Sequence, residues 1–117
     1  MKIKKATKKN LKEIGKLMKE EFSKPPFNEK ASMKTILKSL NFYHGNGEIY
    51  FAEENKKIIG VIVFQKEQWW EGKVIIIQDL AIKERFQHQE IGKSLMKFVE
   101  NYAIKKDAKR IYFETNK

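Results

Sequence analysis

Residues 74–99 contain the pattern that most restricts how this chain can fold. Val74 opens a run of four apolar, β-branched residues, which favours a strand buried on both faces. From Gln87 onward the apolar residues take a helical spacing, so that one stripe contains Ile91, Leu95, Phe98, Val99 and Tyr102. The pattern therefore predicts a buried strand, a short polar turn and an amphipathic helix, in that order.

The turn between this strand and this helix has the composition of an anion-binding site. The first N–H groups of a helix lack partners inside the helix, and the helix dipole adds about half a positive charge there. In the loop at residues 85–93, Gly92 allows close approach to the backbone, while Arg85, His88 and Lys93 add side-chain donors. We therefore expect this loop to bind a phosphate group.

The composition of the whole chain limits the classes of function. With 117 residues, we expect a single domain over residues 1–117. The absence of cysteine excludes disulfides, thiolate metal sites and a cysteinyl acyl-enzyme, and two distant histidines argue against a metal site. The polar N-terminus and the lack of an apolar run of roughly 18 residues predict a cytoplasmic protein without a membrane span.

The net charge of +10 attracts polyanions such as nucleic acid, acidic membranes or a phosphorylated cosubstrate. Nearly all of the positive charge comes from lysine, because Arg85 and Arg110 are the only arginines, and it is scattered over the predicted solvent faces. Nucleic-acid-binding proteins favour arginine in a clustered patch. We therefore rank dedicated nucleic-acid binding below lysine-rich solvation of the surface.

The rest of the chain adds two helices and further strands around this central unit. Asn10 and Glu13 have the spacing of a capping box before the first helix, which Pro25 and Pro26 terminate. The patterns predict a strand at 1–5, helices at 10–22 and from 33 to Gly45 or Gly47, hairpin strands at 48–53 and 58–64, a second hairpin turning at 69–72, and a last strand at 110–114 parallel to the Val74 strand. The predicted fold class is α/β with a mixed sheet, in the order βααβββαβ.

Around the central turn, the sequence resembles the GNAT superfamily of N-acetyltransferases. The family strand ends in an apolar L-x-V, for which Leu80-Ala81-Ile82 stands here, and the family loop is Q/R-x-x-G-x-G/A, which residues 87–92 match except at Glu90. The predicted order of elements is also that of the family, so the resemblance covers the whole chain. It implies the acyl-CoA N-acyltransferase fold.

The resemblance implies that acetyl-coenzyme A binds along this strand and loop. Leu80 and Ile82 would pair with the pantetheine arm, and the N–H of Leu80 or Ala81 would polarise the thioester carbonyl, so that Leu80, Ala81 and Ile82 all bind the cosubstrate. The pyrophosphate would lie on the loop residues Gln87, His88, Gln89, Glu90, Ile91, Gly92, Lys93 and Ser94. Because Glu90 replaces the first glycine of the motif, its carboxylate should weaken binding unless it points to solvent.

Asp79, together with Gln78, lies where some family members carry paired acids that face the acceptor amine. Such an amine is ~99.9% protonated at neutral pH, so a base or a water chain has to remove its proton. We predict that Asp79 is this base or an anchor for the amine. The alternative is that Asp79 bonds nearby backbone at a strand bulge. Glu67 and Glu71 are weaker candidates.

Three aromatic side chains are candidates for the acceptor site. Phe27 lies where the substrate loop of the family falls, and Trp69 and Trp70 could line the same site. The alternative for the tryptophans is a hairpin whose indoles cover an edge of the core. Ser94 has no readable His-Asp arrangement around it, so we expect its hydroxyl to bond backbone or phosphate rather than to act as a nucleophile.

In the family, the strand predicted at residues 110–114 is followed by a helix and two strands for which this sequence has no residues. Ile111, Tyr112 and Phe113 would then lie on an open sheet edge, which is a liability for a free monomer. We expect either that the chain is a fragment of a longer protein or that a second copy covers this edge in a homodimer.

The resemblance therefore implies an N-acetyltransferase that transfers an acetyl group from acetyl-coenzyme A directly to a primary amine, in a ternary complex and without a metal. Two alternatives stay open. One is a GNAT-like module that has lost catalysis and binds coenzyme A weakly or serves as a partner surface. The other is a basic nucleic-acid-binding protein. The identity of the amine acceptor is not readable from these residues.

Overall fold

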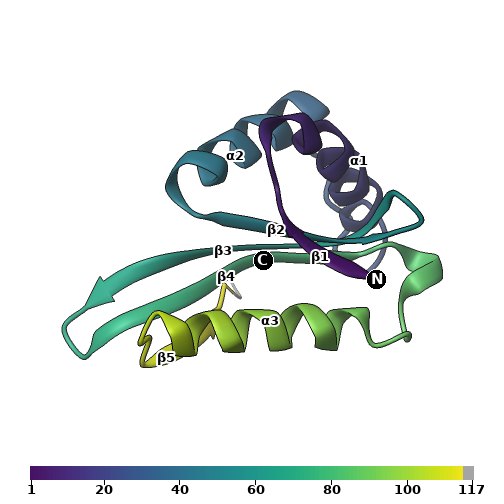
Figure 1. The fold of residues 1–117 in the computed structure, drawn as a ribbon. Helices are drawn as coiled ribbons and strands as arrows, with labels where there is room; N and C mark the ends of the chain where they lie inside the picture. The colour runs from purple at the N-terminus through teal and green to yellow at the C-terminus, as the bar shows by residue number, and fades with distance from the viewer. Residues whose placement is uncertain (115–117) are drawn as a thin grey trace.

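A computed structural model of the chain describes residues 1–114, which form a five-stranded mixed sheet with helices on both faces (Figure 1). Its elements are β1 (Lys2–Lys5), α1 (Leu11–Phe22), α2 (Met33–Asn46), β2 (Glu48–Glu54), β3 (Lys57–Trp69), β4 (Gly72–Ile82), α3 (Ile91–Lys105) and β5 (Arg110–Phe113), with short 3-10 turns η1 (Lys8–Asn10) and η2 (Glu84–Phe86). This is the predicted order βααβββαβ, so the predicted fold is confirmed. Within residues 1–114, the search for a helix with the length and apolarity of a membrane span finds none.

The sheet has the strand order β1-β2-β3-β4-β5, so each strand pairs with its neighbours along the chain. The first four strands are antiparallel, and β5 pairs parallel to β4, as the helical crossover through α3 predicts. Helices α1 and α2 cover one face, and α3 covers the other (Figure 1). Two apolar clusters result, one around Ile14, Leu40 and Val61 under α1 and α2, and one around Phe64 and Leu95 under α3.

A bulge in β4 decides which residues face each helix layer. Val63 pairs with Asp79 and Phe64 pairs with Ile77, so Gln78 is an extra residue without a partner on β3. Before the bulge, Ile77 packs in the cluster under α3. After the bulge, Ala81 packs in the cluster under α1 and α2. The bulge therefore shifts the side-chain alternation by one residue and places Asp79 on the α1 side of the sheet.

The pairing between strands β4 and β5 ends at Ile77. Their pairing covers Val74–Ile77, and the Glu114 N–H donates the last bond to the Ile77 carbonyl at 2.9 Å. Strand β4 continues to Ile82, so its second half has a strand partner only on the β3 side within the described residues. Strand β5 is the last strand of the described sheet, which agrees with the predicted open edge. A homodimer at this edge stays a prediction.

The start of α1 differs from the prediction. The Asn10 side chain does not cap the helix but accepts a hydrogen bond from the Thr7 N–H at 2.9 Å, because η1 begins the helical turn earlier in the chain. The Glu13 carboxylate accepts a hydrogen bond from the N–H of Ile58, on β3, at 3.1 Å. The predicted capping box is therefore wrong, and Glu13 instead ties α1 to β3.

Candidate functional site

A crevice opens where β4 leaves β5. This first hollow has a volume of about 370 Å³ and lies beside the β4 backbone at residues 77–80. The rings of Phe22, Phe27 and Phe113 form its apolar walls. Crevices of this kind, beyond the ends of parallel strands that separate, are common ligand sites in α/β proteins. The structure thus places Phe27 and Asp79, both predicted for the acceptor site, in the same hollow.

The first hollow is acidic although the protein is strongly basic. Glu29, Asp79 and Glu114 line it, and no lysine, arginine or histidine of residues 1–114 does so. The net charge of the whole chain is +10. Three acidic residues around one hollow favour a positively charged guest, because like charges that line a concave surface add their potentials, although Glu29 and Glu114 are themselves exposed. Asp79 itself also makes contacts within the protein.

A second hollow continues along β4 from Leu80 to Ile82 and has a volume of about 300 Å³. One wall is the end of α1 and the segment at residues 24–27. The other wall contains Glu84 and Gln87, from the loop that follows β4. The predicted pantetheine-binding residues Leu80, Ala81 and Ile82 therefore line a hollow between the first hollow, with which it shares Leu80, and the loop.

The loop at residues 83–90 leads into the N-terminus of α3. The Ser94 N–H donates to the Glu90 carbonyl at 3.0 Å, so the N–H groups of Ile91, Gly92 and Lys93 come before the first bond of the helix and have no partner inside it. A third hollow of about 430 Å³ lies against this end. It is lined by Ile82, Phe86, Gln87, His88, Glu90, Gly92 and Lys93. The predicted phosphate loop thus has both donors and space.

Glu90 lines the third hollow, and most of its side chain is exposed to solvent. It has a left-handed backbone conformation with φ of 64°, which favours glycine, and its side chain is 75% exposed. Its carboxylate lies 3.5 Å from the Lys93 ammonium, which is also exposed. The negative charge is therefore at the edge of the site, and Lys93 partly compensates it.

The other side chains of the loop are placed as follows. Gln89 donates to the Arg85 carbonyl at 3.3 Å, and His88 has a left-handed backbone with φ of 69°. Ser94 lies in the first turn of α3, with no described nucleophilic triad around it. Adding a Cβ to Gly92 would meet no atom within 4 Å, so the fold itself leaves this position open.

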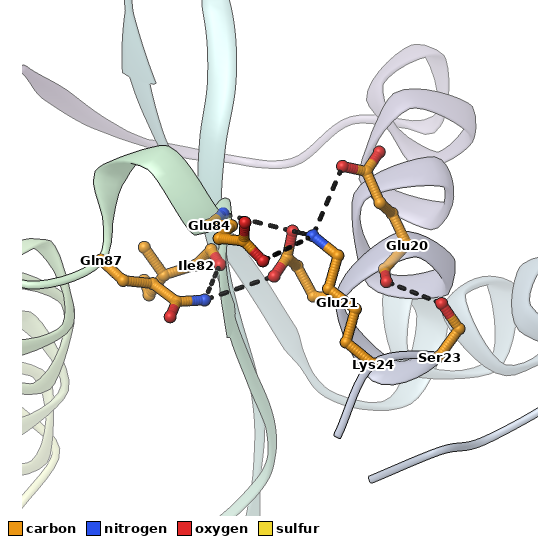
Figure 2. Close-up of polar contacts among 7 residues, drawn as sticks. All are labelled: Glu20, Glu21, Ser23, Lys24, Ile82, Glu84 and Gln87. Carbon is orange, nitrogen blue, oxygen red and sulfur yellow. Dashed lines mark hydrogen bonds and ion pairs between the residues drawn. The ribbon is translucent and has the colours of Figure 1, made fainter. Parts of the chain in front are cut away.

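The Gln87 side chain forms hydrogen bonds within the protein that the sequence analysis missed. Its side-chain amide donates to the Ile82 carbonyl at 2.9 Å and to the Glu21 carboxylate at 3.3 Å (Figure 2). The other oxygen of Glu21 accepts from the Glu84 N–H at 3.2 Å and from the Lys24 ammonium at 3.3 Å. We call Glu21, Lys24, Glu84 and Gln87 the Glu21 cluster. A signal for it existed, because Glu21 continues the apolar stripe of α1 seven residues after Ile14.

Lys24 carries the positive charge of the Glu21 cluster. Its ammonium also lies 3.2 Å from the Glu84 carboxylate and 3.9 Å from Glu20 (Figure 2). The hydrogen bond to Glu84 raises the pKa of Lys24 above its ordinary value, and Glu21 acts in the same direction against partial desolvation. Lys24 is therefore an ammonium at neutral pH and balances part of the negative charge around it.

The tip of the β3–β4 hairpin lies away from these hollows. Trp69 stacks on the Tyr112 ring at 5.0 Å, Trp70 is fully exposed, and neither lines the first or second hollow. The indole N–H of Trp69 donates to Glu67 at 2.9 Å, which lowers the pKa of Glu67, and Glu71 pairs with Arg110. Acceptor contacts of the two tryptophans stay a prediction without support from this geometry.

Residues 1–114 contain no group of three histidine, aspartate or glutamate side chains placed to hold a metal ion. The acidic residues of the first hollow and of the Glu21 cluster thus do not form such a group. The chemistry available in the described site consists of backbone N–H groups at α3, the exposed side of β4 and the carboxylates beside it.

Comparison with known proteins gives a consistent result for this architecture. The model of the acetyltransferase (GNAT) family matches residues 11–117. A search of curated proteins found no match. The family match runs from α1 to β5, so it includes the residues that line every hollow described above.

Solved structures share the fold at low sequence identity. A possible acetyltransferase from Clostridium difficile 630 is 17% identical, with a TM-score of 0.86 over 99% of this chain and 80% of that chain. An aminoglycoside acetyltransferase from an uncultured soil metagenomic sample, in complex with sisomicin, is 23% identical, with a TM-score of 0.73 over 99% and 78%. An integron cassette protein from the mobile metagenome of Cole Harbour Salt Marsh is 15% identical, with a TM-score of 0.87 over 97% and 76%.

Proposed function

The chain belongs to the GNAT acetyltransferase family, and on this premise we propose that it transfers an acetyl group from acetyl-coenzyme A to a primary amine. Family and fold support acyl transfer in general. The observation that supports the specific reaction is the row of three hollows along β4, neighbouring ones sharing lining residues, from the N-terminus of α3 to an acidic crevice. Such a row suits a long cosubstrate with a phosphate at one end and a reactive group at the other.

The residues present fit acetyl-coenzyme A, which supplies an activated acetyl thioester when bound. The N–H groups of Ile91, Gly92 and Lys93 would hold the diphosphate in the third hollow. The side of β4 that β5 does not cover, from Leu80 to Ile82, would hold the pantetheine arm as an added strand. An N–H of Leu80 or Ala81 would donate a hydrogen bond to the thioester oxygen as negative charge develops there.

The acidic crevice supports an amine as the acceptor. An ammonium is attracted by Glu29, Asp79 and Glu114, and it must lose a proton before it can attack a carbonyl. Asp79 lies beside the β4 residues assigned to the thioester, so we assign to it the acceptance of this proton, directly or through one water. Gln78, as the bulged residue, sets the face on which Asp79 lies. The acceptor is then bound in a ternary complex without an acyl-enzyme.

Calorimetric titration with acetyl-coenzyme A tests this function first. We expect saturable 1:1 binding with a dissociation constant below about 1 mM, the upper end of ordinary Michaelis constants. A thiol-release assay with di- and polyamines, monoamines and peptides then identifies the acceptor, and the acidic crevice predicts that the polyamines react best. Lack of binding below about 1 mM, together with DNA or RNA affinity that falls steeply with salt, would instead support a nucleic-acid-binding protein.

Glu90→Gly is expected to bind acetyl-coenzyme A about fivefold more tightly than the wild type, because a like charge near the diphosphate costs about 1 kcal/mol even in water. It should also raise the melting temperature, since a left-handed residue with a side chain costs about 1 kcal/mol or more relative to glycine. Titration calorimetry and thermal unfolding measure the two effects.

Glu90→Gln separates the two causes, because it removes the charge and keeps the strained Cβ. We expect it to increase affinity without the gain in stability. If neither variant of Glu90 binds acetyl-coenzyme A more tightly than the wild type, the charge of Glu90 does not weaken cosubstrate binding. A wild type that binds weakly and gains turnover only in Glu90→Gly would favour the alternative of a module with reduced catalysis.

A further inference from the structure

The Glu21 cluster joins two parts of the site that are distant in the sequence. Glu21 lies in the last turn of α1, whereas Glu84 and Gln87 follow 63 and 66 residues later. Glu21 is only 7% exposed, and its two oxygens accept hydrogen bonds from three donors, two of which lie in the loop before α3 (Figure 2). The end of α1 cannot move relative to this loop without breaking these contacts.

The two joined segments are opposite walls of the site. The segment directly after Glu21 carries Phe22 and Phe27, which line both the first and the second hollow. Gln87, on the other side, lines both the second and the third hollow. The cluster therefore connects the wall of the acidic crevice to the wall of the phosphate loop, at the middle of the row of hollows along β4.

A carboxylate at this position is not needed for helix packing. Glu21 lies in the apolar stripe of α1, where a leucine or methionine would bury more apolar surface at no cost of desolvating a charge. Gln87 also bonds the Ile82 carbonyl at the end of β4, so the contact with Glu21 fixes the loop against two elements at once. The cost of burying the charge is consistent with a role in holding the geometry of the site.

We infer that Glu21 is a positioning residue that holds the acceptor wall and the phosphate loop at a fixed separation, so that both substrates of the ternary complex are aligned. The inference rests on the proposed function. Glu21 itself does not contact the reacting atoms. Its effect is on the binding of both substrates, because each of them lies against one of the two joined walls.

Glu21→Gln tests this role with a minimal change of shape. The hydrogen-bond partners of the Glu21 carboxylate, Lys24, Glu84 and Gln87, are all donors, so the NH₂ group of a glutamine would face a donor whichever way it points. We expect about tenfold weaker binding of acetyl-coenzyme A and a similar rise in the acceptor KM, which is the usual size of coupling within a bonded cluster. The kcat with both substrates saturating should stay within about threefold.

Glu20→Gln is the matched control. Glu20 is the adjacent residue of α1, it is exposed, and it reaches Lys24 only at 3.9 Å, so its replacement should change neither constant by more than about twofold. Gln87→Met breaks the same contact from the loop side, together with the bond to the Ile82 carbonyl, and should weaken acetyl-coenzyme A binding at least as much as Glu21→Gln. Combining both substitutions should add little, because the contact is already lost in each single variant.

Hydrogen exchange of the Glu84 amide provides a readout that does not depend on activity. In Glu21→Gln this N–H should exchange faster than in the wild type and in Glu20→Gln. A wild type that fails to bind acetyl-coenzyme A overturns the proposed function, and the role of Glu21 with it. A wild type that binds, with Glu21→Gln and Gln87→Met binding equally well, overturns this inference alone.

Discussion

Gly92→Val is expected to weaken binding of acetyl-coenzyme A by about 100-fold or more and to leave the fold intact. A Cβ at Gly92 meets no protein atom within 4 Å, so the added side chain would project into the third hollow. There it would keep the diphosphate from the N–H groups at the start of α3. Charge-assisted hydrogen bonds contribute about 1.5–3 kcal/mol each, so the loss of two of them accounts for the expected factor.

Gly45→Val is the control for this substitution. Gly45 lies in α2, and a Cβ there also meets nothing within 4 Å, but it lines none of the hollows on β4. Both variants replace a helical glycine and should change the free energy of unfolding by no more than about 1 kcal/mol. Titration calorimetry and thermal unfolding compare the two. Equal affinity of both variants and the wild type would show that the diphosphate binds elsewhere.

Asp79→Asn is expected to lower kcat/KM by about 10²–10⁴-fold, which is the usual contribution of a general base. Asparagine cannot accept the proton, which explains the loss of rate. Because asparagine has nearly the same shape as aspartate, acetyl-coenzyme A binding should change little. The loss should be largest for acceptors that are fully protonated at the assay pH. Steady-state kinetics from pH 6 to 10 measure this, because deprotonated amine in solution should restore part of the rate at high pH.

Glu29→Gln is the matched control for Asp79→Asn. It removes another carboxylate of the first hollow without touching β4. We expect it to raise the acceptor KM and to leave the shape of the pH profile unchanged. A pH profile of Asp79→Asn that is parallel to that of the wild type would show that Asp79 only attracts the ammonium. If kcat/KM of Asp79→Asn were unchanged, Asp79 would have only the structural role of bonding nearby backbone at the bulge.

Much of the fold was predictable because its signals are local. The run of β-branched residues from Val74 predicted a strand buried on both faces, and the spacing from Ile91 to Tyr102 predicted the helix that starts at Ile91. The loop between them was predicted to lie at a helix N-terminus, and it does. The failed capping box at Asn10 shows the limit, since Glu13 has the right spacing but bonds Ile58 on β3 instead.

The candidate site was only partly predictable. The motif predicted Leu80 at the end of a strand and Gly92 in the loop that leads into the next helix. The structure shows a hollow beside each of them. The motif said nothing about Glu29 and Glu114, which come from a loop and a strand end and meet Asp79 only in the folded chain. Nor did it indicate that Glu21 would find its partners more than sixty residues away.

By itself, the sequence determined the elements, their order and the loop at the start of α3, because these depend on the spacing of apolar residues and on breakers within a few turns of chain. Only the tertiary structure decided which face Asp79 occupies. Strand alternation alone would put it beside Ile77, under α3, and the extra residue Gln78 moves it to the α1 side. The physical reason is that a bulge is defined by the pairing of β4 with β3, and the acidic crevice by where β5 stops pairing with β4.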